Sequence, residues 1–200
     1  MMKAISKIFT AFAAVAFVCT AFADDMKEGL GKIDNSGKKT LVVYYSVSGN
    51  TEGIAKQIQS KLNCDIKELE TKEAYPSDYE ELTKVAKEQL EKDTTPELKE
   101  DVDVSNYDIV FVGTPVWWSK MAVPVKAFLK GGNFSGKTII PFITHGGSGR
   151  CSIPEDMRET AKDVDVLEPL VVSGSGGANT THEIDAWLVE DLGFLKNTTK

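Results

Sequence analysis

Three runs of consecutive apolar residues place the tightest constraint on the fold of this 200-residue chain. Residues 41–45 read LVVYY, residues 109–113 read IVFVG, and residues 139–143 read IIPFI. A strand with one solvated face alternates apolar and polar side chains, whereas a strand covered on both faces is apolar throughout. The runs therefore predict buried strands of a parallel sheet that has helices on both faces.

Helical patterns alternate with the strands along the chain. Capping boxes, in which Ser or Thr precedes Glu by three positions, predict helix starts at Ser77, Ser152 and Thr180, and Gly193 is expected to end the last helix. Five strands that alternate with five helices predict an α/β doubly wound sheet with right-handed crossovers. The expected strands are residues 40–46, 64–69, 109–113, 137–143 and 166–172, and the expected helices are 50–62, 77–91, 122–129, a segment from 152, and 180–192.

The first predicted strand runs directly into a polar loop and then a helix. The loop contains Ser46, Ser48, Gly49, Asn50 and Thr51, and it has neither Lys nor Arg. The first N–H groups of a helix lack intrahelical partners, and the helix dipole favours negative charge there. A triphosphate-binding loop would need the motif G-x-x-x-x-G-K-S/T, which this loop lacks. The loop therefore suits a single phosphate monoester, and the alternative is an ordinary turn capped by Ser48 or Asn50.

Two further loops should reach the same carboxyl edge of the sheet. Residues 113–121 place Trp117 beside Trp118, and each indole offers a flat apolar face and one N–H donor. One of the two tryptophans could instead plug the core. Residues 144–152 contain Gly146, Gly147 and Gly149, which would let the backbone approach a ligand closely. A plain flexible turn is the alternative for this third loop.

Together the three loops resemble the FMN site of the flavodoxin-like family. The family's phosphate loop reads roughly S/T-x-S/T-G-x-T, and residues 46–51 read SVSGNT. Its G-S/T-P-x-W/Y-W segment lies against the flavin ring, and residues 113–118 read GTPVWW. The resemblance covers about residues 39–195. It implies a five-stranded sheet of order 2-1-3-4-5, non-covalent FMN, and cofactor contacts from Ser46, Ser48, Gly49, Asn50, Thr51, Thr114, Pro115, Val116, Trp117, Trp118, His145, Gly146, Gly147, Gly149 and Arg150.

His145 and Arg150 lie in the third loop, which in this family runs along the pyrimidine side of the flavin. Reduced FMN is commonly anionic at its N1–O2 edge, so a cation or a neutral imidazole donor nearby would stabilise the reduced state. We expect such a contact to favour two-electron chemistry. A solvated Arg150 is the alternative, because Arg is mostly exposed in proteins.

Other patterns of catalytic or metal sites are absent from the sequence. His, Cys and carboxylate residues do not cluster at metal-ligand spacing, there is no C-x-x-C, and the nucleophile motif G-x-S-x-G is not matched. Cys64 and Cys151 are expected at opposite ends of a parallel sheet, so we expect no disulfide between them. We therefore assign no catalytic residue and no metal ligand.

Residues 1–23 have the pattern of a bacterial secretory signal peptide. Lys3 and Lys7 precede an uncharged apolar stretch, and Ala21-Phe22-Ala23 forms a cleavage site. The stretch falls short of the roughly 20 residues of a spanning helix, so cleavage is favoured over a retained membrane anchor. We expect an exported protein, periplasmic or secreted, with a flexible lead-in over residues 24–38 and one domain over residues 39–200.

The formal net charge of −7 makes nucleic acid and anionic membrane surfaces poor partners, and stable membrane insertion is not expected after signal removal. The resemblance implies an FMN-dependent redox protein that passes electrons to a partner protein. One alternative is an FMN-dependent NAD(P)H:quinone-type reductase that acts on a quinone-like small molecule. Another is a non-redox periplasmic module that holds flavin or a different phosphorylated ligand.

Overall fold

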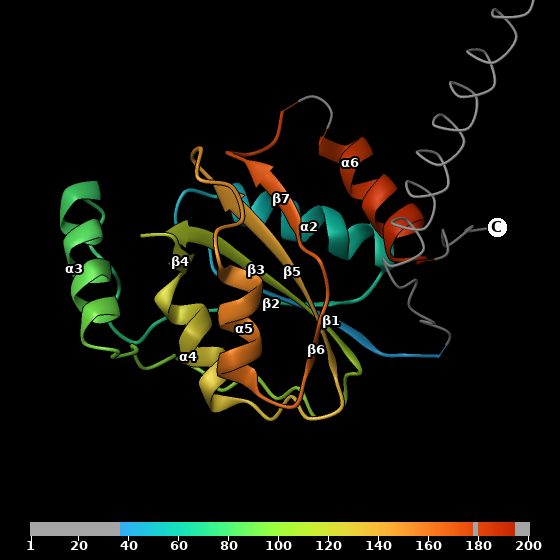
Figure 1. Cartoon of the computed structure of the whole chain (residues 1–200), viewed down its shortest axis with the longest axis horizontal. Coiled ribbons are helices and arrows are strands. Elements are labelled where there is room, and N and C mark those ends of the chain that lie inside the picture. Colours follow the sequence, from blue (N-terminus) through green and yellow to red (C-terminus); the bar gives the residue numbers. More distant parts are fainter. Residues whose placement is uncertain (1–36, 178–179, 195–200) are drawn as a thin grey trace, which may run out of the picture.

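The computed structural model describes residues 37–177 and 180–194, which form one sheet with helices on both faces (Figure 1). The expected signal peptide and most of the expected lead-in lie outside the described residues. Within the described ranges, no helix is both long enough and apolar enough to cross a membrane.

A seven-stranded sheet forms the centre of the domain. Neighbouring strands run parallel in the order β2-β1-β3-β5-β6, β7 also pairs parallel with β5, and the short β4 pairs antiparallel with β3. The main parallel strands therefore all end at the same edge of the sheet. The strands are β1 (Thr40–Tyr44), β2 (Asp65–Glu68), β3 (Ile109–Trp117), β4 (Lys120–Met121), β5 (Thr138–His145), β6 (Asp165–Val166) and β7 (Leu170–Ser173).

The predicted strand order 2-1-3-4-5 is confirmed, with a refinement at the last strand. β6 and β7 pair with successive parts of β5 and together occupy the place of the single edge strand predicted over residues 166–172. The interruption between them contains Pro169. Proline has no N–H to donate to the ladder and is tolerated at a sheet edge, which accounts for the break. β4 is not among the predicted strands, and it forms because the chain reverses in a tight hairpin after β3.

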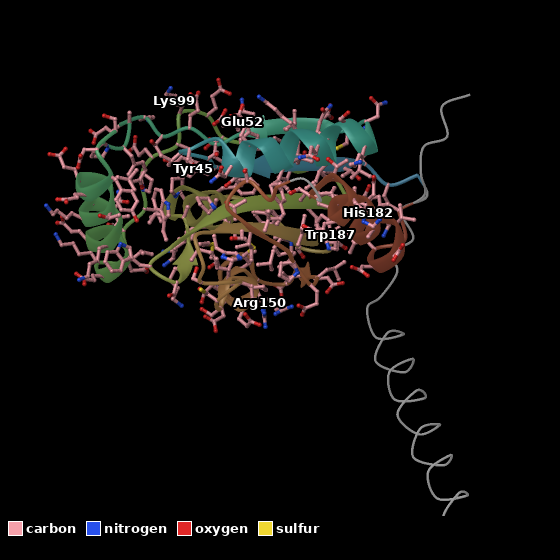
Figure 2. The ribbon with its side chains drawn as sticks, turned by 90° about the horizontal axis from the view of Figure 1, so that it is seen from above. Tyr45, Glu52, Lys99, Arg150, His182 and Trp187 are labelled. Carbon is pink, nitrogen blue, oxygen red and sulfur yellow. The ribbon has the colours of Figure 1, made fainter. Side chains whose placement is uncertain are left out.

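Helices cover the two faces of the sheet and give each face its own apolar core. Figure 2 shows Glu52 of α2 and Arg150, which precedes α5, on opposite sides of the sheet. On the α2 side the core includes Ile54, Ile58 and Trp187, and the core on the α5 side is built around α4 and α5. The elements are α2 (Asn50–Leu62), α6 (Thr180–Ala186) and the π-helical turn η1 (Trp187–Asp191) on one side, and α4 (Val123–Gly131) and α5 (Ile153–Ala161) on the other.

The helix between β2 and β3, α3 (Tyr79–Glu91), lies on neither face. Leu82 and Ala86 are the buried residues of this helix, and neither belongs to the two core clusters. Figure 1 shows α3 beyond the carboxyl end of β3, beside β4. Leu98 and Val104, from the connection that follows α3, pack on the core instead. The crossover between β2 and β3 therefore leaves its helix free to border the carboxyl edge.

Helix starts differ in detail from the predicted capping boxes. The cap of α3 is Asp78 rather than Ser77, because the Asp78 carboxylate accepts the Glu81 N–H at 3.0 Å. Ser152 precedes α5, but its hydroxyl donates to the Asp156 carboxylate and accepts no N–H from the first turn. Thr180 is the first residue of α6, and Gly193 follows η1 with a φ of 72°, which suits glycine.

The two cysteines of the described chain lie at opposite ends of the sheet. Cys64 directly precedes β2 and Cys151 follows β5, and both thiols are free. Burial raises the pKa of Cys64 to about 11, so this thiol stays protonated at neutral pH.

Gly113→Ala is expected to destabilise the sheet. A Cβ at this position would lie 2.2 Å from Cζ of Phe142 and 2.9 Å from Cβ of Tyr44. Phe142 is fully buried opposite Gly113 on β5, so it cannot move aside without repacking. We expect the free energy of unfolding to fall by about 1–3 kcal/mol through overpacking, measured by urea denaturation.

Gly53→Ala is the matched control. Gly53 is exposed in α2, and an added Cβ would meet nothing within 4 Å. Alanine favours a helix over glycine, so the free energy of unfolding should rise by roughly 0.5–1 kcal/mol. Equal effects of the two substitutions would contradict the packing argument at Gly113.

Candidate functional site

A cleft of about 460 Å³ lies at the carboxyl edge of the sheet, where the three predicted loops meet. The parallel pairing of β3 with β1 and with β5 brings these loops together. The predicted residues that line the cleft are Ser48, Asn50, Pro115, Val116, Trp117, Trp118, His145 and Gly146. Ser46, Gly49, Thr51, Thr114, Gly147, Gly149 and Arg150 are outside this lining.

The loop between β1 and α2 has two features of an anion site. Gly49 is the N-cap of α2, with a φ of 83°, and no side chain caps the helix. Ser46 Oγ is buried without a hydrogen-bond partner, which holds for no other side-chain nitrogen or oxygen among the described residues. An unpaired buried hydroxyl costs about 1–3 kcal/mol, so a turn capped by its own side chains does not account for the arrangement. A bound anion would satisfy both the hydroxyl and the helix N-terminus.

Two predicted ligand residues use their hydroxyls to hold the loops together. Thr51 Oγ1 lies 2.8 Å from Thr144 Oγ1, and this buried hydrogen bond joins the start of α2 to the end of β5. The Thr114 hydroxyl accepts the Ala122 N–H and donates to the Pro115 carbonyl, both at 2.9 Å. Thr114 is fully buried. These two side chains therefore fix the walls of the cleft and do not face its interior.

Trp118 forms, with Ser119, the two-residue turn between β3 and β4. Both residues have positive φ, 50° and 62°, which is the pattern of a type I′ turn. Asn and Gly favour such turns, and a bulky residue there is strained. Contacts with α3 hold Trp118, because its indole N–H donates to the Thr83 carbonyl at 3.0 Å and the Lys87 ammonium lies 5.2 Å from the ring centroid. The side chain nevertheless stays exposed at the mouth of the cleft.

Trp117 has a different set of neighbours. Its ring makes edge-on contacts with Tyr45 and Tyr75 at centroid distances of 5.6 and 5.1 Å. Burial, with a smaller contribution from the negative charge of Glu68, raises the pKa of Tyr45 to about 12, so the phenol stays protonated at neutral pH. Trp117 packs against the core and also lines the cleft. The expectation that one tryptophan could plug the core therefore holds in part.

Helix α3 provides a wall of the cleft that the sequence analysis missed. Tyr79, Leu82, Thr83 and Ala86 all line it. The spacing of Leu82 and Ala86 indicates an apolar helix face, but that pattern does not distinguish packing on a sheet from packing on a loop. Tyr79 is 79% exposed, so most of its ring is accessible at the edge of the cleft. Thr144 and Gly174 complete the lining and are also absent from the predicted contacts.

The glycine loop brings some of its predicted residues to the cleft and not others. His145 and Gly146 line the cleft, and the Gly147 N–H donates to Nδ1 of His145 at 2.9 Å. Arg150 makes hydrogen bonds of 3.0 and 3.2 Å to the Glu155 carboxylate. A hydrogen bond from the backbone of Glu155 and then the bond from Arg150 lower the pKa of that carboxyl. Figure 2 shows Arg150 on the side of the sheet opposite α2. The structure therefore does not bring Arg150 to the cleft.

The cleft lining is uncharged although the protein is acidic. No Asp, Glu, Lys or Arg is among the described residues that line it. Within the same described part of the chain, no group of three His, Cys, Asp or Glu side chains is placed to hold a metal ion. Aromatic faces with a few polar groups suit a flat, largely uncharged ligand, and the adjoining α2 N-terminus adds a place for one anionic group.

Trp118→Ala should loosen α3 selectively, because it removes an indole hydrogen bond and a cation–π contact. We expect the amides of residues 79–91 to exchange hydrogen roughly tenfold faster, while those of β1 and β3 are unchanged. Hydrogen exchange with mass spectrometry measures this effect. Trp118→Phe keeps a ring for Lys87 but loses the donor, so its effect should be intermediate. Unchanged exchange in the alanine variant would show that Trp118 does not hold α3.

Among solved structures, the chain is similar to a presumed flavoprotein from Bacteroides eggerthii, with 26% identity and a TM-score of 0.67 over 76% of this chain and 96% of that chain. It is also similar to a flavoprotein from Lactobacillus acidophilus that was solved in complex with FMN. That pair has 27% identity and a TM-score of 0.60, over 75% of this chain and 98% of that chain. No curated protein sequence matches the chain.

The sequence model of one protein family, described as Flavodoxin, matches residues 39–191. This range runs from the residue before β1 to the end of η1 and contains all three loops of the cleft. The chain therefore belongs to the flavodoxin family.

Proposed function

We propose that this protein binds FMN non-covalently in the cleft and transfers electrons through it. The observation that carries the proposal is an uncapped helix N-terminus and the unpaired Ser46 hydroxyl in the loop that leads into an uncharged, aromatic-walled cleft. FMN has matching parts, since it joins one phosphate monoester to a flat ring. Membership of the flavodoxin family and the likeness to the Lactobacillus acidophilus FMN complex support the proposal.

Each part of the site has its own task in this proposal. Ser46 and the backbone N–H groups of the first turn of α2 would hold the phosphate. Trp117 and Trp118 would offer aromatic faces to the ring. Thr114 holds the hairpin that carries them, so this wall is set before the ligand arrives. Bound FMN supplies reversible one-electron and two-electron chemistry that ordinary side chains lack.

The wall formed by α3 favours a second candidate, an FMN-dependent reductase of a quinone-like small molecule. Tyr79 and Leu82 border the cleft, so they would limit the approach of a broad protein surface and still admit a flat molecule. We further propose that the protein acts after export, because residues 1–23 have the pattern of a signal peptide. Its redox partner, protein or small molecule, would then belong to the same compartment.

Visible spectroscopy of the mature chain, starting at Asp24, tests the proposal. The protein is mixed with FMN, freed of excess cofactor and reduced stepwise without oxygen. We expect a retained flavin band. Two resolved one-electron steps would support a carrier between proteins, and a single two-electron step would support the reductase. A chain that retains no flavin would overturn the proposed function.

Ser46→Ala should have opposite effects on the free chain and on the complex. Because the hydroxyl is buried without a partner, its removal should leave the free energy of unfolding unchanged or raise it by up to about 1 kcal/mol. The affinity for FMN should fall about tenfold, the size of one charge-assisted hydrogen bond. Urea denaturation and fluorescence titration measure the two quantities.

Riboflavin is the matched control ligand, because it has the flavin ring and no phosphate. Its affinity should be the same for Ser46→Ala and for the unmodified chain. Equal losses of affinity for riboflavin and FMN would show that Ser46 does not contact the phosphate. An unchanged affinity for FMN would show that Ser46 has no role in binding.

A further inference from the structure

His145, which lines the cleft, makes hydrogen bonds with both its backbone and its imidazole. Its backbone is fixed at the end of β5, where it pairs with Ser173 of β7, and its carbonyl accepts the Gly174 N–H at 2.8 Å. The residue lines the cleft and is half-buried. The backbone that carries the imidazole is therefore held in place at the carboxyl edge of the sheet.

A local turn selects one tautomer of this imidazole. The Gly147 N–H donates to Nδ1 at 2.9 Å, so Nδ1 acts as an acceptor and carries no proton. The bond joins residues two apart, as in the turns that Asn and Asp side chains make with their own backbone. Gly147 has a φ of 127°, which a residue with a side chain adopts poorly, so glycine is needed at this position. In the neutral ring the proton must then lie on Nε2.

The other ring nitrogen, Nε2, faces no hydrogen-bond partner in the part of the chain that the structure describes. Among residues 37–177 and 180–194, no group hydrogen-bonds to Nε2 of His145. The described lining contains no acidic or basic side chain that would compete for it. We propose that His145 is a cofactor-contacting residue that donates a hydrogen bond from Nε2–H, as an uncharged donor, to the acceptor edge of the flavin. This inference rests on the proposed function.

Such a donor would act on the reduced cofactor more than on the oxidised one. Reduction places negative charge on the flavin, and a hydrogen bond to a charged acceptor is stronger than one to a neutral acceptor. His145 would therefore raise the reduction potential of the bound cofactor through one directed hydrogen bond. Arg150 does not contribute, because it is paired with Glu155 outside the cleft.

Two conservative substitutions separate this role from that of holding the loop. His145→Asn keeps an acceptor near the position of Nδ1 for the Gly147 N–H and loses the distant donor. His145→Gln places an amide N–H donor at about the position of Nε2 and loses the acceptor for the Gly147 N–H. His145→Phe has neither group. The readout is the two-electron midpoint potential of bound FMN, with the affinity for oxidised FMN measured alongside.

We expect His145→Asn and His145→Phe to bind reduced FMN about tenfold more weakly relative to oxidised FMN, which lowers the midpoint potential by about 30 mV. His145→Gln should keep most of the original potential. If His145→Asn instead kept the original midpoint potential and His145→Gln lowered it, His145 would only hold the loop, and the proposal would be overturned. The same potential in all variants that retain flavin would overturn it as well.

Nitrogen NMR of the imidazole in the free protein, recorded at a pH where the ring is seen to be neutral, gives a readout independent of the cofactor. We expect a protonated Nε2 and an unprotonated Nδ1, and a proton on Nδ1 would overturn the inference. Failure of the proposed function has a different signature, because the unmodified chain would then retain no FMN whatever the tautomer.

Discussion

Parallel pairing of three central strands is the constraint on which the rest of this structure depends. β1, β3 and β5 lie side by side with their carboxyl ends at one edge, so the polar loop, the tryptophan hairpin and the glycine loop all leave from that edge. Gly113 makes the close approach possible, because Phe142 fills the space that a side chain would need. Loops that are nearly a hundred residues apart in sequence thereby share one cleft, and the Thr51–Thr144 hydrogen bond ties two of them together.

Strained backbone and an unpaired buried hydroxyl both occur at the carboxyl edge of the sheet. Ser46 has a buried hydroxyl without a partner, and Trp118 and Ser119 adopt positive φ in the hairpin. Each feature costs of order 1–3 kcal/mol, a large share of the 5–15 kcal/mol that stabilises a typical domain. Stability of the fold alone would favour an alanine in place of Ser46 and an Asn-Gly turn in place of Trp118 and Ser119. Both departures lie where a ligand site is expected, which agrees with their having a role in binding.

The sequence predicted the fold well because its main signals are local and strong. Apolar runs such as residues 139–143 identify strands buried on both faces, and α2 has the predicted bounds. Capping at Ser77 and Ser152 was predicted less well, because the Asp78 carboxylate caps α3 one residue later and the Ser152 hydroxyl donates to the Asp156 carboxylate. Residues of the candidate cleft could be predicted where one continuous loop contains a recognisable sequence pattern, as in residues 113–118. Helix α3 was predicted as an element, but its place beside the cleft was missed. That place involves contacts between distant segments, such as the Trp118–Thr83 hydrogen bond, which no periodicity reports.

Trp118 belongs to two environments at once, since its indole is bound to α3 and its side chain also lines the cleft. A molecule that stacks on this ring would therefore touch a side chain that is also a contact of α3. Lys87 lies outside the cleft lining, yet its positive charge faces the same ring. The electrostatics of the ring surface thus depend on a residue that a bound molecule would not touch.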